Sequence, residues 1–156
     1  MKLKTKQRGA ETVEFAIILP ILLIILFGIM EYGIVLYDKA VITNASREGA
    51  RSGIAYKCPV LSEAQIRAAV IRATSLTGGG TSLLFSFASG ATAPTITITP
   101  TPPTTTTNCF TNSGTPLTVT VTYSYRFLAL GKLMSLFVPG FTNPIMLSST
   151  TVMNYE

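Results

Sequence analysis

The sequence predicts an α+β protein in which a long N-terminal helix, membrane-spanning in its first half, packs on a small antiparallel sheet, with a second short helix. Three observations predict this fold. Residues 15–37 are almost entirely apolar. After them, a helical spacing of apolar and small residues continues without a breaker to about Ile54. Beyond residue 80 the apolar period changes to two, which is typical of strands.

The composition indicates one folded unit and one membrane element. The 156 residues are 47% hydrophobic and only 12% charged, which is too apolar for a disordered tail. Four of the twelve basic residues (Lys2, Lys4, Lys6 and Arg8) precede Gly9, and without them basic and acidic residues nearly balance. The net charge of +5 therefore indicates no basic patch, and we expect no nucleic-acid partner.

Catalytic chemistry is not expected of this chain. It has no His, and its two cysteines, Cys58 and Cys109, form no CxxC pair. Neither a metal site nor a Ser-His-Asp or Cys-His arrangement is therefore expected. The acidic residues lie mostly in the helical third, so no general acid–base pair can be named. We expect no enzymatic activity and no cofactor.

The stretch from Phe15 to Tyr37 predicts a membrane span, since Glu31 is its only ionisable group and its length falls within the roughly 17–25 residues required. Four cations precede it, which places the N-terminus in the cytoplasm and the C-terminal part outside. A cleaved secretory signal is the competing interpretation, but no A-x-A-like site follows the apolar block. Two possibilities therefore remain for the N-terminus: an uncleaved anchor, or cleavage before the apolar segment.

Glu14 bears on that choice. A charge at membrane depth costs about 2.5–3.5 kcal/mol and is usually paired or functional. A cut between Gly9 and Ala10 would create an α-amine four residues before Glu14. This amine is mostly cationic at neutral pH, since its unperturbed pKa is about 7.7–8.0. In a bundle of such helices, the amine of one subunit can meet Glu14 of the next. Alternatively, Glu14 is an ordinary first-turn residue favoured by the helix dipole.

The N-terminal residues resemble a known processing signal. "RGAETVEF", with Gly at the last leader position and Glu at the fifth mature position, resembles the class III signal of type IV prepilins and pseudopilins. The segment from Arg8 to about Arg51 resembles the TadE-like pseudopilins of tight-adherence (Flp/Tad) pili. This second resemblance rests on Glu14-Phe15, Pro20, Phe27-Gly28, Glu31-Tyr32-Gly33 and "REGAR" at 47–51.

The resemblance implies a structural subunit with a type IV pilin-like fold. A prepilin peptidase would cut between Gly9 and Ala10, and Glu14 and Phe15 would serve subunit assembly. The implied partners are that peptidase, other pilin or pseudopilin subunits, the Tad assembly platform and the inner membrane. The implied location is the bacterial inner membrane, single-pass, or the pilus itself. These residues do not separate TadE-like from TadF-like roles.

The chain then divides into three segments. Residues 1–9 are expected to form a cytoplasmic leader, residues 10–54 the long helix with its span at about 15–37, and residues 55–156 an extracytoplasmic α+β domain. Within the helix, a stripe of small residues at i+4 spacing predicts close approach to the protein's own sheet. Its members are Ala45, Gly49 and Gly53. The charged residues of "REGAR" are expected to be solvated, with a subunit contact as the alternative.

Two residues of the span leave alternatives open. Pro20 either allows the helix to bend when it leaves lipid for a filament or is simply tolerated, because neighbouring helices can satisfy the backbone. Glu31 is expected to be an interfacial residue beside Tyr32 and Tyr37 at the outer edge of the span.

The domain is expected to contain a second helix and several strands. "LSEAQIRAAVIRATSL" predicts a helix with a capping box at Ser62 and Gln65 and an apolar face. Strict alternation predicts a half-buried strand at 117–127, with its odd-numbered residues inside. Weaker strands are expected at 83–88, 95–99 and 147–155.

Two loops and the cysteines complete the analysis. If the domain is extracytoplasmic, a disulfide between Cys58 and Cys109 is expected. The Thr/Pro-rich loop at 99–116 predicts an exposed connector, with glycosylation as the alternative. Residues 131–146 either cover the domain's own core or form an apolar docking patch. The rival to the pseudopilin hypothesis is an uncleaved, anchored binding or accessory protein that keeps its Met1 end.

Overall fold

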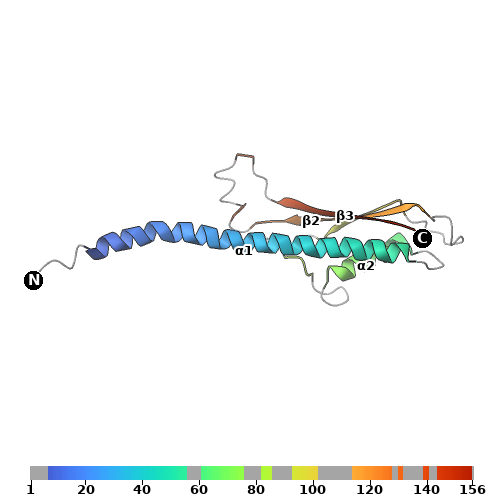
Figure 1. Ribbon diagram of the computed structural model, residues 1–156, viewed down its shortest axis with the longest axis horizontal. Coiled ribbons are helices and arrows are strands. Elements are labelled where there is room, and N and C mark those ends of the chain that lie inside the picture. The colour runs from blue at the N-terminus through green and yellow to red at the C-terminus, as the bar shows by residue number, and fades with distance from the viewer. Residues whose placement is uncertain are drawn as a thin grey trace, which may run out of the picture.

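Helix α1 (Gln7–Ile54) forms the axis of the molecule, and the other elements pack along its C-terminal half (Figure 1). The computed structural model describes residues 7–55, 61–75, 82–85, 93–101, 114–127, 130–131, 139–140 and 144–155. At 48 residues α1 is about 72 Å long. Its N-terminal half, blue in Figure 1, extends beyond the domain. The predicted α+β fold is confirmed.

A three-stranded antiparallel sheet lies against α1 in the order β1-β2-β3. The strands are β1 (Thr95–Thr99), β2 (Pro116–Tyr125) and β3 (Ile145–Asn154). Every second residue of β2, from Leu117 to Tyr125, is buried, so the predicted alternation is confirmed. The register pairs Ile98 with Val119 and Val119 with Thr151, which aligns the inward faces of all three strands.

The other face of the sheet is rich in hydroxyl groups, with Met146 and Val152 of β3 as exposed apolar exceptions. Thr97, Thr120 and Thr150 lie in one row across the three strands, and the Thr120 and Thr150 hydroxyls are 2.9 Å apart. None of the three strands carries a charged residue. This outer sheet face is therefore polar but electrically neutral.

The strand expected at 83–88 is wrong for the residues that the structure describes. Ser82 forms only an isolated bridge with Ser75, and Leu83–Phe85 form no strand. The Leu83 amide donates to the Thr74 carbonyl (2.7 Å) and the Phe85 amide to Asp38 of α1 (3.0 Å). The amides that a sheet would use are thus taken by the helices. Residues 86–88 lie outside the described residues.

Helix α2 (Glu63–Ala73) packs beside α1, as the sequence predicted. The Ser62 amide donates to Gln65 Oε1 at 2.9 Å, which forms the glutamine half of the expected capping box. Arg67 pairs with Glu63 and also donates to the Ile96 carbonyl of β1 at 2.6 Å. This arginine therefore joins α2 to the edge of the sheet.

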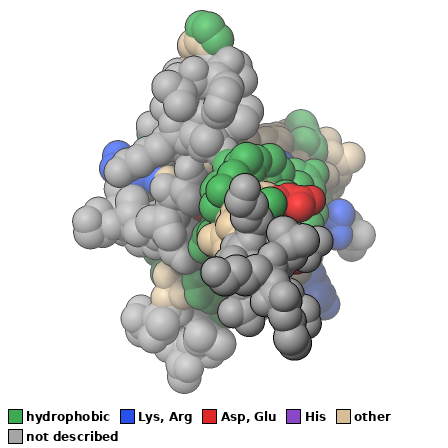
Figure 2. Space-filling view, turned by 90° about the vertical axis from the view of Figure 1, so that its left-hand side faces the viewer, with side chains coloured by type: hydrophobic (Ala, Val, Ile, Leu, Met, Phe, Trp, Pro, Cys, Tyr) green, Lys and Arg blue, Asp and Glu red, His purple; other side chains and the backbone are tan. Residues whose placement is uncertain are grey.

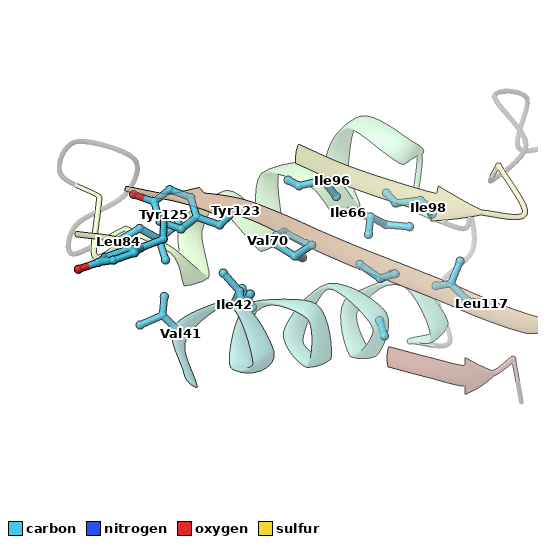
Figure 3. Packing of buried hydrophobic residues seen from close by; sticks show 14 of the residues in the cluster. Val41, Ile42, Ile66, Val70, Leu84, Ile96, Ile98, Leu117, Tyr123 and Tyr125 are labelled. Carbon is cyan, nitrogen blue, oxygen red and sulfur yellow. The ribbon is translucent and has the colours of Figure 1, made fainter. Parts of the chain in front are cut away.

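The hydrophobic core lies between the two helices and the inner face of the sheet (Figure 3). Val41 and Ile42 of α1 point toward β2, and Ile66 and Val70 of α2 lie between β1 and α1. Its fully buried large side chains are Ile42, Ile66, Val70, Leu117, Val119, Val121, Tyr123 and Tyr125.

The predicted small stripe is where α1 approaches its own domain most closely. A Cβ on Gly49 would lie 2.4 Å from Val70 Cγ2 and 3.3 Å from Val119 Cγ1. A Cβ on Gly53 would lie 2.4 Å from Leu117 Cδ2. Real Cβ atoms do not approach so closely, so glycine is required here for packing.

Polar contacts fix α1 against β3 on the same side. Ser46 Oγ lies 3.1 Å from Ser149 Oγ and 2.8 Å from Thr151 Oγ1. Arg47, Glu48 and Arg51, by contrast, are exposed, as expected for the charged residues of "REGAR".

We predict that Gly49→Ala destabilises the fold. Overpacking a core costs about 1–3 kcal/mol, and Val70 is too stiff to move aside easily. The better helix propensity of alanine recovers up to about 1 kcal/mol, so a net loss of about 1–2 kcal/mol is expected in denaturant unfolding of the detergent-solubilised protein. Gly33→Ala is the matched control, since nothing lies within 4 Å of its added Cβ. Equal stability of the two variants would contradict the packing role of Gly49.

Candidate functional site

The exposed stem of α1 is the outstanding surface of the molecule. From Gly9 to Phe27 every residue is exposed, and the most apolar 18-residue window of the helix has no buried residue. Figure 2 looks onto the end of the molecule that is at the left of Figure 1, where hydrophobic side chains gather around the helix with acidic ones beside them. The stem is long and apolar enough to cross a membrane.

The predicted processing and assembly residues all lie at the N-terminal end of this stem. Gly9, Ala10, Glu14 and Phe15 are exposed, and the Phe15 side chain is 62% accessible. A Cβ on Gly9 would meet nothing within 4 Å, so packing within this chain does not require glycine there. Within a single chain these residues make no site; they form a surface that another molecule can contact.

Glu31 is not the interfacial residue that the sequence suggested. Its side chain is 3% exposed and accepts a hydrogen bond from the Leu130 amide at 3.2 Å. One turn earlier, a Cβ on Gly28 would lie 3.7 Å from Leu130 Cδ2. The domain therefore reaches down along the helix and covers this carboxylate, whereas the neighbouring Tyr32 and Tyr37 remain exposed.

Asp38, two turns above Glu31, makes a second contact of the same kind. Its side chain is fully buried, and Oδ1 accepts from the Phe85 amide at 3.0 Å. The Tyr123 hydroxyl donates to the Phe85 carbonyl at 3.1 Å, so both backbone groups of Phe85 are bonded. Glu31 and Asp38 together form what we call the acid clasp, two helix carboxylates that hold two backbone amides of the domain.

The acid clasp lies in a poorly solvated environment. Burial raises the pKa of Asp38 from 3.8 to about 6, and the Phe85 hydrogen bond opposes that rise. Burial, together with the negative charges of Glu31 and Asp38, raises the pKa of Tyr125 to about 12. Among the described residues, Asp38 Oδ2 and the Tyr125 hydroxyl are buried without a hydrogen-bond partner. A charge on Asp38 is therefore tolerated at a cost.

Sequence analysis missed Asp38 and misjudged Glu31, although a signal was present. Positions 31, 38 and 45 repeat every seven residues, and this row continues the small stripe of Ala45, Gly49 and Gly53 toward the N-terminus. Polar residues on the inner side of a predicted helix require partners inside the protein.

The remaining predicted sites lie wholly or largely outside the described residues. Cys58 and Cys109 both lie outside the described residues, so their disulfide stays a prediction. Most of the Thr/Pro-rich loop and most of residues 131–146 also lie outside them. In the described part of the chain, no three His, Cys, Asp or Glu side chains gather into a group that could hold a metal ion.

The geometry defines a class of protein: a small α+β domain built around the upper half of a helix whose lower half is suited to membrane anchoring. Residues 9–51 match a family model described as TadE-like protein, which confirms the family resemblance of the stem and associates the chain with Tad pilus systems. The match ends at Arg51 and lies entirely within α1. No curated protein and no solved structure matches the chain.

We predict that folding stability depends on pH through Asp38. Because its folded pKa is above the ordinary value, the folded state holds the proton more firmly. Stability is therefore highest when Asp38 is protonated and falls as pH rises from about 4 through 6. Asp38→Asn keeps an oxygen for the Phe85 amide and removes the titration, so its thermal midpoint should exceed that of the wild type at pH 7.5 and approach it at pH 4–5.

The control for this experiment is Glu48→Gln, because Glu48 is exposed on the same helix. It should keep the pH dependence of the wild type. Parallel stability curves for the wild type and Asp38→Asn between pH 4 and 8 would contradict the assignment.

Proposed function

We propose that the chain is a structural pseudopilin or minor pilin subunit of a Tad-type pilus. In this proposal a prepilin peptidase cuts it after Gly9, the inner membrane stores it with its N-terminus in the cytoplasm, and it assembles through α1. Its role is to support pilus biogenesis and surface adhesion. The observation that carries the proposal is the TadE-like stem, apolar and exposed throughout, joined without a break to a folded domain.

The exposed stem needs an apolar environment, and the proposal supplies two in succession. Burying an exposed Leu, Ile or Phe side chain gains about 1.5–3 kcal/mol, so a stem of this composition is unfavourable in water. Lipid can cover it before assembly, and neighbouring stems can cover it afterwards. A helix that only anchored the protein would need the first environment alone.

The N-terminal end of α1 is suited to processing. Gly9 lies in the first turn of the described helix, where amides lack intrahelical partners and local opening costs little. After cleavage, the new amine of Ala10 would lie about one helical turn from Glu14, about 6 Å along the axis. An isolated helix leaves both groups exposed, whereas a bundle lets the amine of one subunit pair with Glu14 of its neighbour.

A catalytic role is not part of this proposal. Glu31 and Asp38 are the carboxylates that the fold brings inside, and each accepts a backbone amide of the domain. They connect the stem to the domain. A groove of about 510 Å³ between α1 and α2 has a mixed polar and apolar lining in which Glu48 is the single carboxylate, so its lining contains no pair of acids.

We predict that the mature chain begins at Ala10. The N-terminal peptide of membrane-extracted protein should start at Ala10 in cells with the prepilin peptidase and at Met1 in cells without it, as read by mass spectrometry. Gly9→Leu should keep the Met1 end in both strains. A Met1 end in wild-type cells with active peptidase would favour the rival, an uncleaved anchored accessory protein.

We also predict that Glu14 serves assembly and not processing. Glu14→Gln should be cleaved normally but should lose copurification with other pilin subunits from solubilised membranes. The physical reason is that removing one partner of a buried ion pair costs about 3–5 kcal/mol. Glu11→Gln is the matched control, since Glu11 is an equally exposed acid one turn earlier. Equal copurification of the two variants would contradict the role of Glu14.

A further inference from the structure

The apolar surface of α1 does not end where the domain begins. Beyond Gly28, the helix face that points away from the domain still carries large exposed apolar and aromatic side chains. They are Ile29 (69% exposed), Met30 (54%), Tyr32 (63%) and Leu36 (52%); Tyr37 (42%) lies at the side of this face, where its ring packs on Phe85. Glu31, the only carboxylate of this stretch, is covered by the domain. The outward face is therefore suited to lipid as far as Tyr37.

The domain lies against the opposite face of this same stretch. Leu130 lies against the helix at Glu31 and Gly28, six and nine residues below Tyr37. Nine residues of α-helix rise about 13 Å. If lipid surrounds the outward face up to Tyr37, the domain surface at Leu130 lies at the same depth and cannot remain in bulk water.

We infer that the lower end of the domain, which we call the foot and define as Phe85 and Leu130, is inserted into the outer leaflet of the bilayer. Its partner is lipid: acyl chains at Leu130 and the boundary between acyl chains and headgroups at Phe85. This inference rests on the proposed storage of the stem in the membrane.

The polar groups of the foot are arranged for such a place. Backbone amides in hydrocarbon require partners within the protein. The Leu130 amide donates to Glu31 and the Phe85 amide to Asp38, so the acid clasp satisfies both while the protein shields the two carboxylates.

The side chains around Phe85 agree with a position at the boundary. Phe85 is 57% exposed and packs on Tyr37 with ring centroids 5.7 Å apart, and tyrosine is enriched at membrane interfaces. Exposed cations follow at once. Lys39 donates to the Ser148 carbonyl, and Arg126 is exposed at the end of β2, from where a long side chain can reach headgroup phosphates.

Tryptophan fluorescence in proteoliposomes tests the foot directly, because the chain contains no Trp. Single-tryptophan variants of the full-length chain would be reconstituted with lipids brominated at defined acyl positions. Leu130→Trp and Phe85→Trp probe the foot. The latter replaces one exposed ring by another and remains informative if Leu130→Trp disturbs packing. Leu23→Trp reports the stem, and Ile71→Trp, on the exposed side of α2, reports the upper domain.

The expected result is bromine quenching of Leu130→Trp comparable with that of Leu23→Trp. Phe85→Trp should be quenched best by bromine near the carbonyl end of the chains, and Ile71→Trp should not be quenched. Quenching of Leu23→Trp alone would overturn the foot and leave membrane storage intact. Absence of quenching in all variants would overturn both.

Discussion

The close approach of α1 to its own domain at Gly49 and Gly53 is the constraint on which the rest of the structure depends. With no side chain at these two positions, the helix backbone lies directly against Val70, Val119 and Leu117. The helix and the α2–sheet layer therefore share one core. Because α1 is uninterrupted between this core and Gly9, the surface properties of the stem and the position of the domain are set by a single element.

The acid clasp extends the contact between α1 and the domain, which we call the seam, with polar interactions in place of apolar ones. Beyond the N-terminal end of the core, the helix face toward the domain carries Asp38 and Glu31 in place of small residues. Here hydrogen bonds to the Phe85 and Leu130 amides take the place of apolar packing. A buried carboxylate that accepts a hydrogen bond from a backbone amide makes the contact directional, since each such bond specifies one position of the domain along the helix. The cost is desolvation, which is visible in the raised pKa of Asp38. The seam thus exchanges some stability for a fixed depth of the domain beside the stem.

The sequence predicted those features that depend on periodicity. The long helix, the alternation in β2 and the approach at Gly49 and Gly53 all follow from spacing within one segment. It did not predict the roles of Glu31 and Asp38, because their partners are backbone amides far away in the chain, and no pattern marks which amide a carboxylate will meet. Within the described residues 83–85, the expected strand was wrong for the same reason: Leu83 and Phe85 have strand-like composition, but helix groups take their amides.

Because the helix is continuous, the number of residues in the stem also sets the rotation of the domain about the helix axis. Each α-helical residue rises 1.5 Å and turns the chain by about 100°. One residue inserted between Gly9 and Gly28 would therefore rotate the domain by about 100° relative to the N-terminal end of the stem. Seven inserted residues would return the domain to within about 20° of its original direction and move it about 10 Å further along the helix axis. The hydroxyl-lined outer sheet face turns with it. The number of residues in the stem thus selects the direction in which the domain presents its neutral face.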